Sequence, residues 1–183
     1  MVCTANICRS PMFEGLLRRD LDAHGVPVEV SSAGLLDWDE PADPQAVEVM
    51  TLYGVDISSH RSRPITAVDL AAVDLVLGMT REHAREVVLA HPDLHRRTFT
   101  AKDFERRSSG SVAAEPGADF RQRVAAISEG RTNASLMGSA EEDDIADPHG
   151  QSRRHFETTA ESMDRLSREI SETLSVMIRA GRS

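Results

Sequence analysis

The sequence predicts an α/β fold in which helices cover both faces of a parallel sheet. Short apolar segments alternate with segments of helical periodicity, and the segment AAVDLVLGMT carries a nearly continuous apolar run. Strands buried on both faces have such runs, and parallel strands are usually connected through helices. With 183 residues the chain has the length of one domain, so we expect a single domain over 1–183.

The first helix is predicted close to the start of the chain. Ser10 offers a hydroxyl that can cap helix amides, and Pro11 suits the first helical position. MFEGLLRRDLDAHG follows with apolar residues at helical spacing and ends at Gly25, a residue type common just after a helix. VPVEVSSAG then predicts a short strand, and DPQAVEVMTLYG predicts a second helix that ends on Gly54.

The later segments continue this alternation. AAVDLVLGMT predicts a buried strand, Thr80 can cap a helix in REHAREVVLAHP, and RRTFT predicts a further short strand. The last helix is predicted over about 155–178, because apolar residues recur there every three or four positions. Between about 105 and 146 the pattern is irregular apart from a short helix near 120–127, so we expect a mobile surface insertion there.

Composition narrows the possible functions. The net charge of −9 disfavours nucleic acid, whose phosphates attract Lys and Arg. We find neither a secretory leader nor a run approaching the ~20 apolar residues of a membrane span, so we expect a cytoplasmic protein without a membrane partner. Cys3 and Cys8 are the only cysteines, too few for a disulfide scaffold or a four-ligand zinc site. We expect a monomer with no metal and no cofactor.

The opening stretch, MVCTANICRSPM, is a candidate phosphate site. A loop that runs into a helix start directs backbone N–H groups and the positive end of the helix dipole at one small volume, which suits a dianion. Cys3 begins the loop, where this field favours the nucleophilic thiolate, and Arg9 can bind two phosphate oxygens. A buried packing cysteine and a surface arginine are the alternative, but their joint spacing with the helix start favours a phosphate site.

Asp147, in the stretch IADPHG, is a candidate general acid. A thiolate that attacks a phosphate monoester needs a proton donor for the leaving oxygen, and a carboxylic acid can supply that proton. Asp-Pro alone is a common turn opening. Only together with the phosphate loop does it indicate catalysis.

VCTANICRSPM resembles the signature loop of the low molecular weight protein tyrosine phosphatases. The resemblance continues through SSAG, GVDISSHRSRPIT and DLVLGMT, and ADP lies late in the chain, where that family carries its general acid. It therefore covers most of the chain outside the insertion. It implies a three-layer α/β/α fold with a four-stranded parallel sheet, a phosphate-binding loop at the start of the first helix and, here, a truncated first strand.

The resemblance also implies a role for each matching residue. Cys3 would form a phosphocysteine intermediate, Arg9 would bind the transition state, and Asp147 would protonate the leaving group and then activate water. The substrate would be a phosphotyrosine protein or a small phosphomonoester. The loop itself consists of Thr4, Ala5, Asn6, Ile7, Cys8 and Ser10, and hydrogen bonds from Asn6, Ser10, Ser32 and His60 would hold it in shape, with the Ser10 hydroxyl also helping the thiolate to leave.

Four further positions bear on the substrate and on regulation. Trp38 falls where the family has one aromatic wall of the cleft, although ordinary packing is the alternative. His149 follows the Asp-Pro where members most active on phosphotyrosine have aromatic residues. Ile7 stands where the arginine phosphatase branch carries threonine, which favours an apolar phenyl group. Cys8 is either a packing residue or, as in relatives under peroxide, a disulfide partner of Cys3.

Two departures from the family and two other functions are also considered. Only Met1 and Val2 precede Cys3, where the family has a longer central strand, so we expect the native start to lie upstream. Ala5 stands where many relatives have glycine, and a positive φ there would strain it. The other functions are an arsenate reductase that uses a small-molecule thiol, since no cysteine follows Cys8, and a phosphate-binding domain without turnover.

Overall fold

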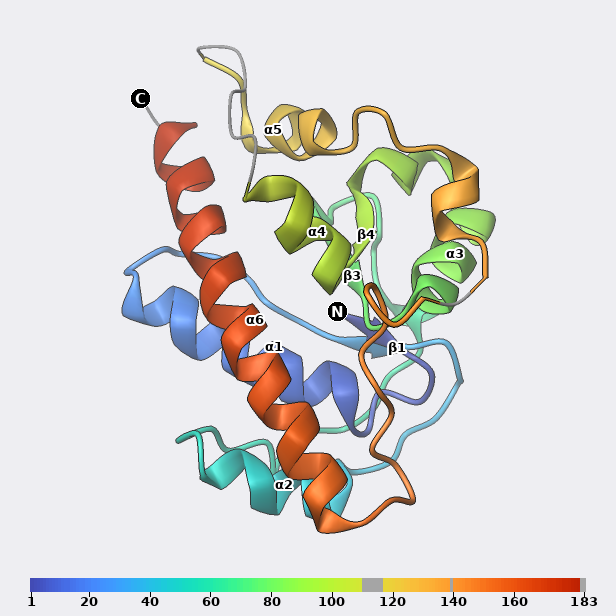
Figure 1. Cartoon of the computed structure of the whole chain (residues 1–183), viewed down its shortest axis with the longest axis vertical. Helices are drawn as coiled ribbons and strands as arrows, with labels where there is room; N and C mark the ends of the chain where they lie inside the picture. Colours follow the sequence, from blue (N-terminus) through green and yellow to red (C-terminus); the bar gives the residue numbers. More distant parts are fainter. Residues whose placement is uncertain (110–116, 139, 182–183) are drawn as a thin grey trace.

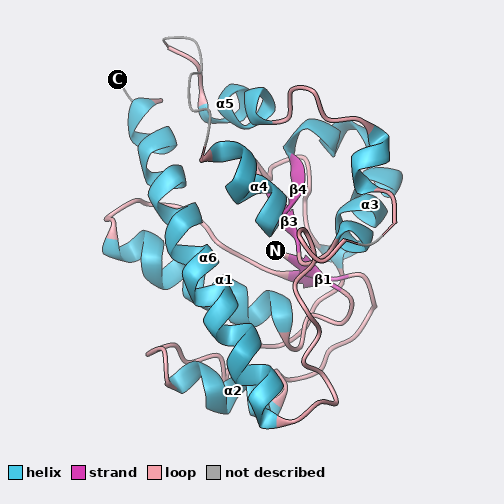
Figure 2. Cartoon of the chain, viewed as in Figure 1, coloured by secondary structure: helices cyan, strands magenta, loops and turns pink. Residues whose placement is uncertain are grey.

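The computed structural model describes residues 1–109, 117–138 and 140–181 and has three layers (Figure 1). Four parallel strands form one sheet in the order β2-β1-β3-β4, and helices surround it (Figure 2). This confirms the predicted α/β fold with a four-stranded parallel sheet. The strands are β1 (Val2–Cys3), β2 (Ala33–Gly34), β3 (Val76–Gly78) and β4 (Thr98–Thr100).

The helices lie on both faces of the sheet. In Figure 1 the long α6 crosses α1 on one side of the strands, and α3 lies on the other side. The α-helices are α1 (Arg9–Ala23), α2 (Pro44–Thr51), α3 (Arg81–Ala90), α4 (Ala101–Ser108), α5 (Phe120–Ile127) and α6 (Arg153–Ala180), with 3-10 turns η1 (Ile65–Ala67), η2 (Pro92–Arg97) and η3 (Asn133–Leu136).

Alternate residues of the strands belong to two separate hydrophobic cores, one on each face of the sheet. Cys3 and Leu77 belong to the larger core, which contains the apolar faces of α1 and α6. Val2 and Val76 belong to the smaller core with Val87 of α3. Successive residues of a strand point to opposite faces, so even these short strands link the two outer layers. This burial on both faces explains the apolar run predicted for β3.

The start of α1 differs from the prediction. The helix begins at Arg9 with Cys8 as its N-cap, and no side chain caps it. Ser10 is therefore not the cap, because its hydroxyl is 3.0 Å from the Cys3 sulfur and accepts a hydrogen bond from Asn6. At the other end, Gly25 follows the helix with φ 64°, as its residue type predicts.

The strand predicted in VPVEVSSAG is much shorter than that segment. Only Ala33 and Gly34 pair with β1, which itself has two residues, Val2 and Cys3. Before Ala33, the Ser31 carbonyl oxygen accepts a hydrogen bond from the Met1 amino group, and Pro27 has no amide to donate. The first strand is nevertheless central, because β1 lies between β2 and β3.

The other predicted elements are found with small shifts in their bounds. Helix α2 ends at Thr51 rather than on Gly54, and α6 extends two residues beyond each end of the predicted 155–178. Thr80 caps α3 by accepting a hydrogen bond from the His83 amide, as predicted. Helix α4 was not predicted, because Phe104 is the only large apolar residue in it.

Part of the predicted insertion at about 105–146 is described. Its helix is found as α5, which is closed by a capping box between Asp119 and Gln122. Val124 and Ile127 of this helix belong to the larger core. Residues 110–116 and 139 of the insertion lie outside the described residues, and its mobility stays a prediction. Within the described ranges, no helix combines the length and hydrophobicity needed to cross a membrane.

Candidate active site

The candidate site lies at the carboxyl ends of β1, β2 and β3. The loop 4–8 connects the end of β1 to the start of α1, so its backbone surrounds the N-terminus of that helix. Gly34, at the end of β2, packs directly on this loop: a Cβ there would lie 3.0 Å from the Thr4 oxygen. A side chain at this position would press on the loop backbone, so glycine suits the close approach. Ligands of open α/β sheets bind at this edge.

The sulfur of Cys3 lies at the base of the loop. The backbone N–H of Asn6 donates a hydrogen bond to Sγ over 3.3 Å, and the Ser10 hydroxyl lies 3.0 Å from the same atom. Both contacts can stabilise a negative charge on sulfur. The thiol is buried and forms no disulfide. The contacts with Asn6 and Ser10 hold it in one position beneath the loop.

Asn6 determines the shape of the loop. Among the described non-glycine residues it alone has a positive φ, 57°, whereas Ala5 does not, so the strain considered for Ala5 falls one position later. Asparagine tolerates this conformation better than most residues. Its side-chain amide donates to the hydroxyls of Ser10 and Ser32, each over 2.8 Å. These bonds offset the strain by tying the loop to α1 and to β2.

The loop-supporting residues predicted from the sequence are brought together. His60 Nε2 is 2.7 Å from the carbonyl oxygen of Asn6, and Ser32 is bonded to the Asn6 side chain. Two further residues were missed by the sequence analysis. Glu14 accepts a hydrogen bond from Ser32 over 2.5 Å, and the Arg63 amide donates to Asn6 Oδ1. Arg63 lies in the segment GVDISSHRSRPIT, whose resemblance to the family could have indicated it.

Arg9 and Asp147 face each other beside the loop. Arg9 Nη2 lies 2.5 Å from Asp147 Oδ2, and Nη1 donates to the carbonyl oxygen of Ile145. The arginine side chain is only 7% exposed and the aspartate 48% exposed. The guanidinium is therefore fixed at the site, while the carboxylate reaches it from the solvent side.

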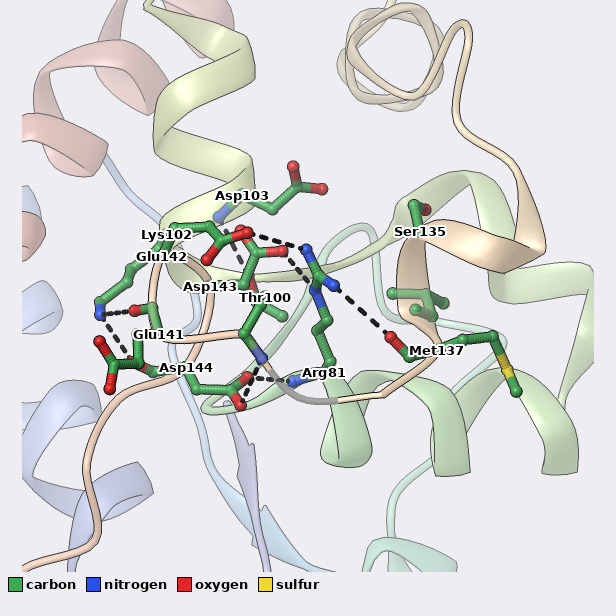
Figure 3. A network of polar contacts seen from close by, with 12 residues as sticks. Arg81, Thr100, Lys102, Asp103, Ser135, Met137, Glu141, Glu142, Asp143 and Asp144 are labelled. Atoms are coloured by element: carbon green, nitrogen blue, oxygen red, sulfur yellow. Dashed lines mark hydrogen bonds and ion pairs between the residues drawn. The ribbon is translucent and has the colours of Figure 1, made fainter.

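The segment that carries Asp147 is anchored through a polar network (Figure 3). Asp143 is buried and accepts hydrogen bonds from Arg81 and Arg106, while Asp144 accepts from the Arg81 amide. Lys102 donates to the carbonyl oxygen of Asp144. Burial would raise the pKa of Asp143, but the bonds from Arg106 and Arg81 outweigh it and hold the pKa below its ordinary value. Asp143, which lies in the segment at about 105–146 predicted as a surface insertion, thus contributes a fixed, buried charge.

A histidine that the sequence analysis missed contacts the loop. His83 Nε2 lies 2.9 Å from the Thr4 hydroxyl, and Nδ1 lies 2.8 Å from the hydroxyl of Thr80. Burial, followed by the charge of Arg9, lowers the pKa of His83 to about 4. The ring is therefore neutral at physiological pH. His83 follows β3, which is the neighbour of β1 in the sheet, and this position could have indicated that it lies near the loop.

The residues predicted at the rim of the cleft are in different environments. Trp38 is exposed, and its carbonyl accepts a hydrogen bond from Ser62. His149 lies against Cys8 and Asp43, and its amide donates to Asp147 Oδ1 over 3.1 Å. Cys8 is buried and unpaired, like Cys3. Ile7 packs partly buried against the larger core.

A buried thiol below the amides of a loop that leads into a helix, with a fixed guanidinium and a carboxylate opposite, can bind a tetrahedral phosphate and attack it. The fold and this site define a cysteine-dependent phosphatase. The family model "Low molecular weight phosphotyrosine protein phosphatase" matches residues 1–116, and the chain belongs to this family. Membership of this family favours phosphatase activity over the two other functions considered, an arsenate reductase and a phosphate-binding domain without turnover.

Individual relatives agree with this assignment. A probable low molecular weight protein-tyrosine-phosphatase EpsP of Ralstonia nicotianae is 34% identical over 165 residues, 90% of this chain and 87% of the relative. A protein-arginine-phosphatase of Bacillus subtilis is 35% identical over 112 residues, 61% of this chain and 74% of the relative. The crystal structure of the low molecular weight protein tyrosine phosphatase from T. tengcongensis superposes with a TM-score of 0.69 at 32% identity, covering 93% of this chain and 95% of that one.

Proposed function

We propose that this phosphatase hydrolyses phosphotyrosine in proteins through a phosphocysteine intermediate on Cys3. The observation that carries the proposal is the convergence of three groups: the Cys3 thiol, the buried Arg9 guanidinium and the Asp147 carboxyl paired with it. Each group supplies one part of phosphoryl transfer, namely the nucleophile, the charge stabilisation and the proton.

The first step transfers the phosphoryl group to sulfur. The Cys3 thiolate attacks phosphorus, the S–P bond forms, and the P–O bond to the tyrosine oxygen breaks. Asp147, protonated at the start of this step, gives its proton to the leaving oxygen. Arg9 binds two equatorial oxygens, and the loop amides bind the developing charge.

The second step releases phosphate. Asp147, now a carboxylate, accepts a proton from a water molecule as the water oxygen attacks phosphorus. The S–P bond breaks and the electron pair returns to sulfur. The Ser10 hydroxyl, 3.0 Å from Sγ, is placed to donate a hydrogen bond to the departing thiolate. The Asn6 amide supports the same charge.

Substrate choice is proposed to rest on the rim. Both tyrosine and arginine phosphatases occur among the relatives, so the leaving group has to be decided by this chain's own residues. Ile7 presents an apolar side chain in the loop, and the exposed indole of Trp38 can pack on a phenyl ring. Both features favour the apolar phenyl ring of phosphotyrosine over the polar guanidinium group of phosphoarginine. The cytoplasmic location and the monomeric state stay predictions.

The test compares two matched peptides, one with phosphotyrosine and one with phosphoarginine at the same position. The wild-type chain is expected to release phosphate from the first with the larger kcat/KM, and Cys3→Ser is expected to abolish turnover of both. Ile7→Thr should shift the ratio toward phosphoarginine. Preference of the wild-type chain for phosphoarginine would refute the substrate assignment, and full activity of Cys3→Ser would refute the mechanism.

A further inference from the structure

Three side chains from separate segments meet at the rim of the cleft: Cys8, Asp43 and His149. Their ligand atoms, Sγ, a carboxylate oxygen and a ring nitrogen, all lie within 4.8 Å of one another. We propose that this cluster, the Cys8 site, binds a divalent cation of borderline softness, with Zn²⁺ as the best match. Thiolate, imidazole and carboxylate together are ligands that zinc accepts, whereas calcium and magnesium prefer oxygen alone.

The distances within the Cys8 site suit a single ion. His149 Nδ1 lies 3.1 Å from Asp43 Oδ2 and 3.8 Å from Cys8 Sγ. With ordinary zinc bond lengths, neighbouring ligands of a tetrahedral ion are about 3.4–3.6 Å apart. Small side-chain adjustments would therefore bring all three atoms to coordination distance.

The three ligand atoms of the Cys8 site face one another closely enough to share one ion. The same ring nitrogen of His149 faces both the carboxylate and the thiol. A protonated Nδ1 can donate to Asp43, and the Cys8 thiol can donate to the same carboxylate. An ion between the three atoms would accept electron density from all of them.

Two of the three ligands are already oriented by the fold. Asp43 caps α2 with Oδ1, which accepts from the Gln45 amide over 2.9 Å, so Oδ2 is the oxygen left to face the site. The Asp43 amide donates to the carbonyl oxygen of Ile7, the residue before Cys8. This bond ties the carboxylate to the loop that carries the thiol. Such supporting contacts are typical of metal ligands.

Charge and access also fit a cation. The carboxylates of Asp43 and Asp147 are near enough to interact electrostatically with the Cys8 thiol. The same carboxylates attract a positive ion, and binding would displace the thiol proton to solvent. The His149 side chain is 58% exposed and that of Asp43 12%, so an ion can enter from the solvent side. The fourth position would hold water.

Occupation of the Cys8 site would affect catalysis, and this consequence rests on the proposed function. His149 follows Asp147 by two residues, and its amide donates to the Asp147 carboxylate. An ion bound to His149 would join the segment of the general acid to the phosphate loop at Cys8. We therefore expect Zn²⁺ to inhibit the phosphatase reversibly, with activity restored by a chelator.

Binding is tested without reference to activity. In Cys3→Ser, Cys8 is the only cysteine of the chain, so a thiolate-to-metal absorption band on adding Co²⁺ reports Cys8 alone. We expect that band at one Co²⁺ per chain, its displacement by Zn²⁺, and at least tenfold weaker binding in His149→Ala and Asp43→Asn. His155→Ala removes an exposed histidine on α6 and is the matched control, expected to bind as before.

The outcomes separate this proposal from the proposed function. Absence of the band in folded Cys3→Ser, or unchanged affinity in His149→Ala, would overturn the metal site. Zinc binding that persists in Cys8→Ser and is lost in Cys3→Ser would also overturn it, because the ion would then occupy the catalytic thiol. A Cys3→Ser chain that binds Co²⁺ through Cys8, with a wild-type chain that hydrolyses no phosphoester, would support the metal site and refute only the phosphatase.

Discussion

Arg9 and Asp147 form an ion pair, with Nη2 2.5 Å from Oδ2, between residues 138 positions apart in the sequence. One partner is buried at the base of the cleft and the other reaches it from an exposed segment. The pair thus joins the residue proposed to bind phosphate to the residue proposed to protonate the leaving group. This relationship leads to the first prediction.

Asp147→Asn should slow the reaction according to the leaving group. We expect kcat for a phosphotyrosine peptide to fall about 100-fold or more, because general acid catalysis contributes on that scale. p-Nitrophenyl phosphate, whose leaving group needs less protonation, should lose less. Steady-state kinetics with a series of aryl phosphates measures the difference. An equal loss for every leaving group would mean that Asp147 acts only by positioning Arg9.

Asn6 is predicted to contribute through its side chain as well as its backbone. Asn6→Ala removes hydrogen bonds to Ser10, Ser32 and the Arg63 amide and places alanine at φ 57°. We expect a loss of about 3 kcal/mol in unfolding free energy, from unpaired buried groups and backbone strain.

Asn6→Gly separates these two effects. Glycine accepts the positive φ but also lacks the amide, so it should recover only about 1 kcal/mol of the loss. Urea unfolding of the three chains measures this difference. If Asn6→Gly were as stable as the wild type, the side-chain bonds would contribute nothing.

His83 is predicted to make stability depend on pH. Its pKa is about 4 in the folded chain and about 6.5 when unfolded, so the unfolded state binds the proton more readily. Stability should therefore fall as pH drops from 6.5 toward 4, by about 3 kcal/mol from this group. In His83→Gln this component should vanish.

The measurement is urea unfolding at pH 7.5 and pH 5, with exposed His155→Gln as the matched control. We expect the difference in unfolding free energy between the two pH values to shrink by about 2 kcal/mol in His83→Gln and to stay unchanged in His155→Gln. Equal pH dependence in all three chains would show that His83 titrates normally.

Asp143 is predicted to stabilise the segment that carries the general acid. Asp143→Asn would weaken its bonds with Arg81 and Arg106 and leave both cations near a buried neutral amide. We expect a loss of about 1–3 kcal/mol, since hydrogen bonds to charged groups have this strength. The neighbouring Glu142→Gln is the matched control, because Glu142 is exposed and lies 3.5 Å from Arg81.

Thermal unfolding and kcat should both distinguish these two variants. Asp143→Asn is expected to lower Tm by several degrees and to lower kcat, because Asp147 lies four residues further along. Glu142→Gln should leave both unchanged. If Asp143→Asn were destabilised but kept the wild-type kcat, the ion pairs of Asp143 would stabilise the fold without positioning Asp147.

The sequence by itself determined the alternation of strands and helices and the phosphate loop. Cys3, Arg9 and the helix start at Ser10 lie within one short segment, so local spacing predicted that they act together, whereas the role of Asn6 came from the family resemblance. Helix α6 was predicted because its apolar periodicity is long and regular. The extent of β2 could not be predicted this way, because a strand's length depends on the residues that its neighbour offers for pairing.

Only the tertiary structure decided which distant side chains meet at the site. The order β2-β1-β3 brings Ser32 and His83 to the loop from either side. The family resemblance predicted Ser32, whereas the sequence analysis did not predict His83. Cys8, Asp43 and His149 likewise come from three segments, and the sequence analysis predicted no metal site. The physical reason is that side-chain chemistry acts over a few ångströms, and packing determines those distances between segments far apart in the chain.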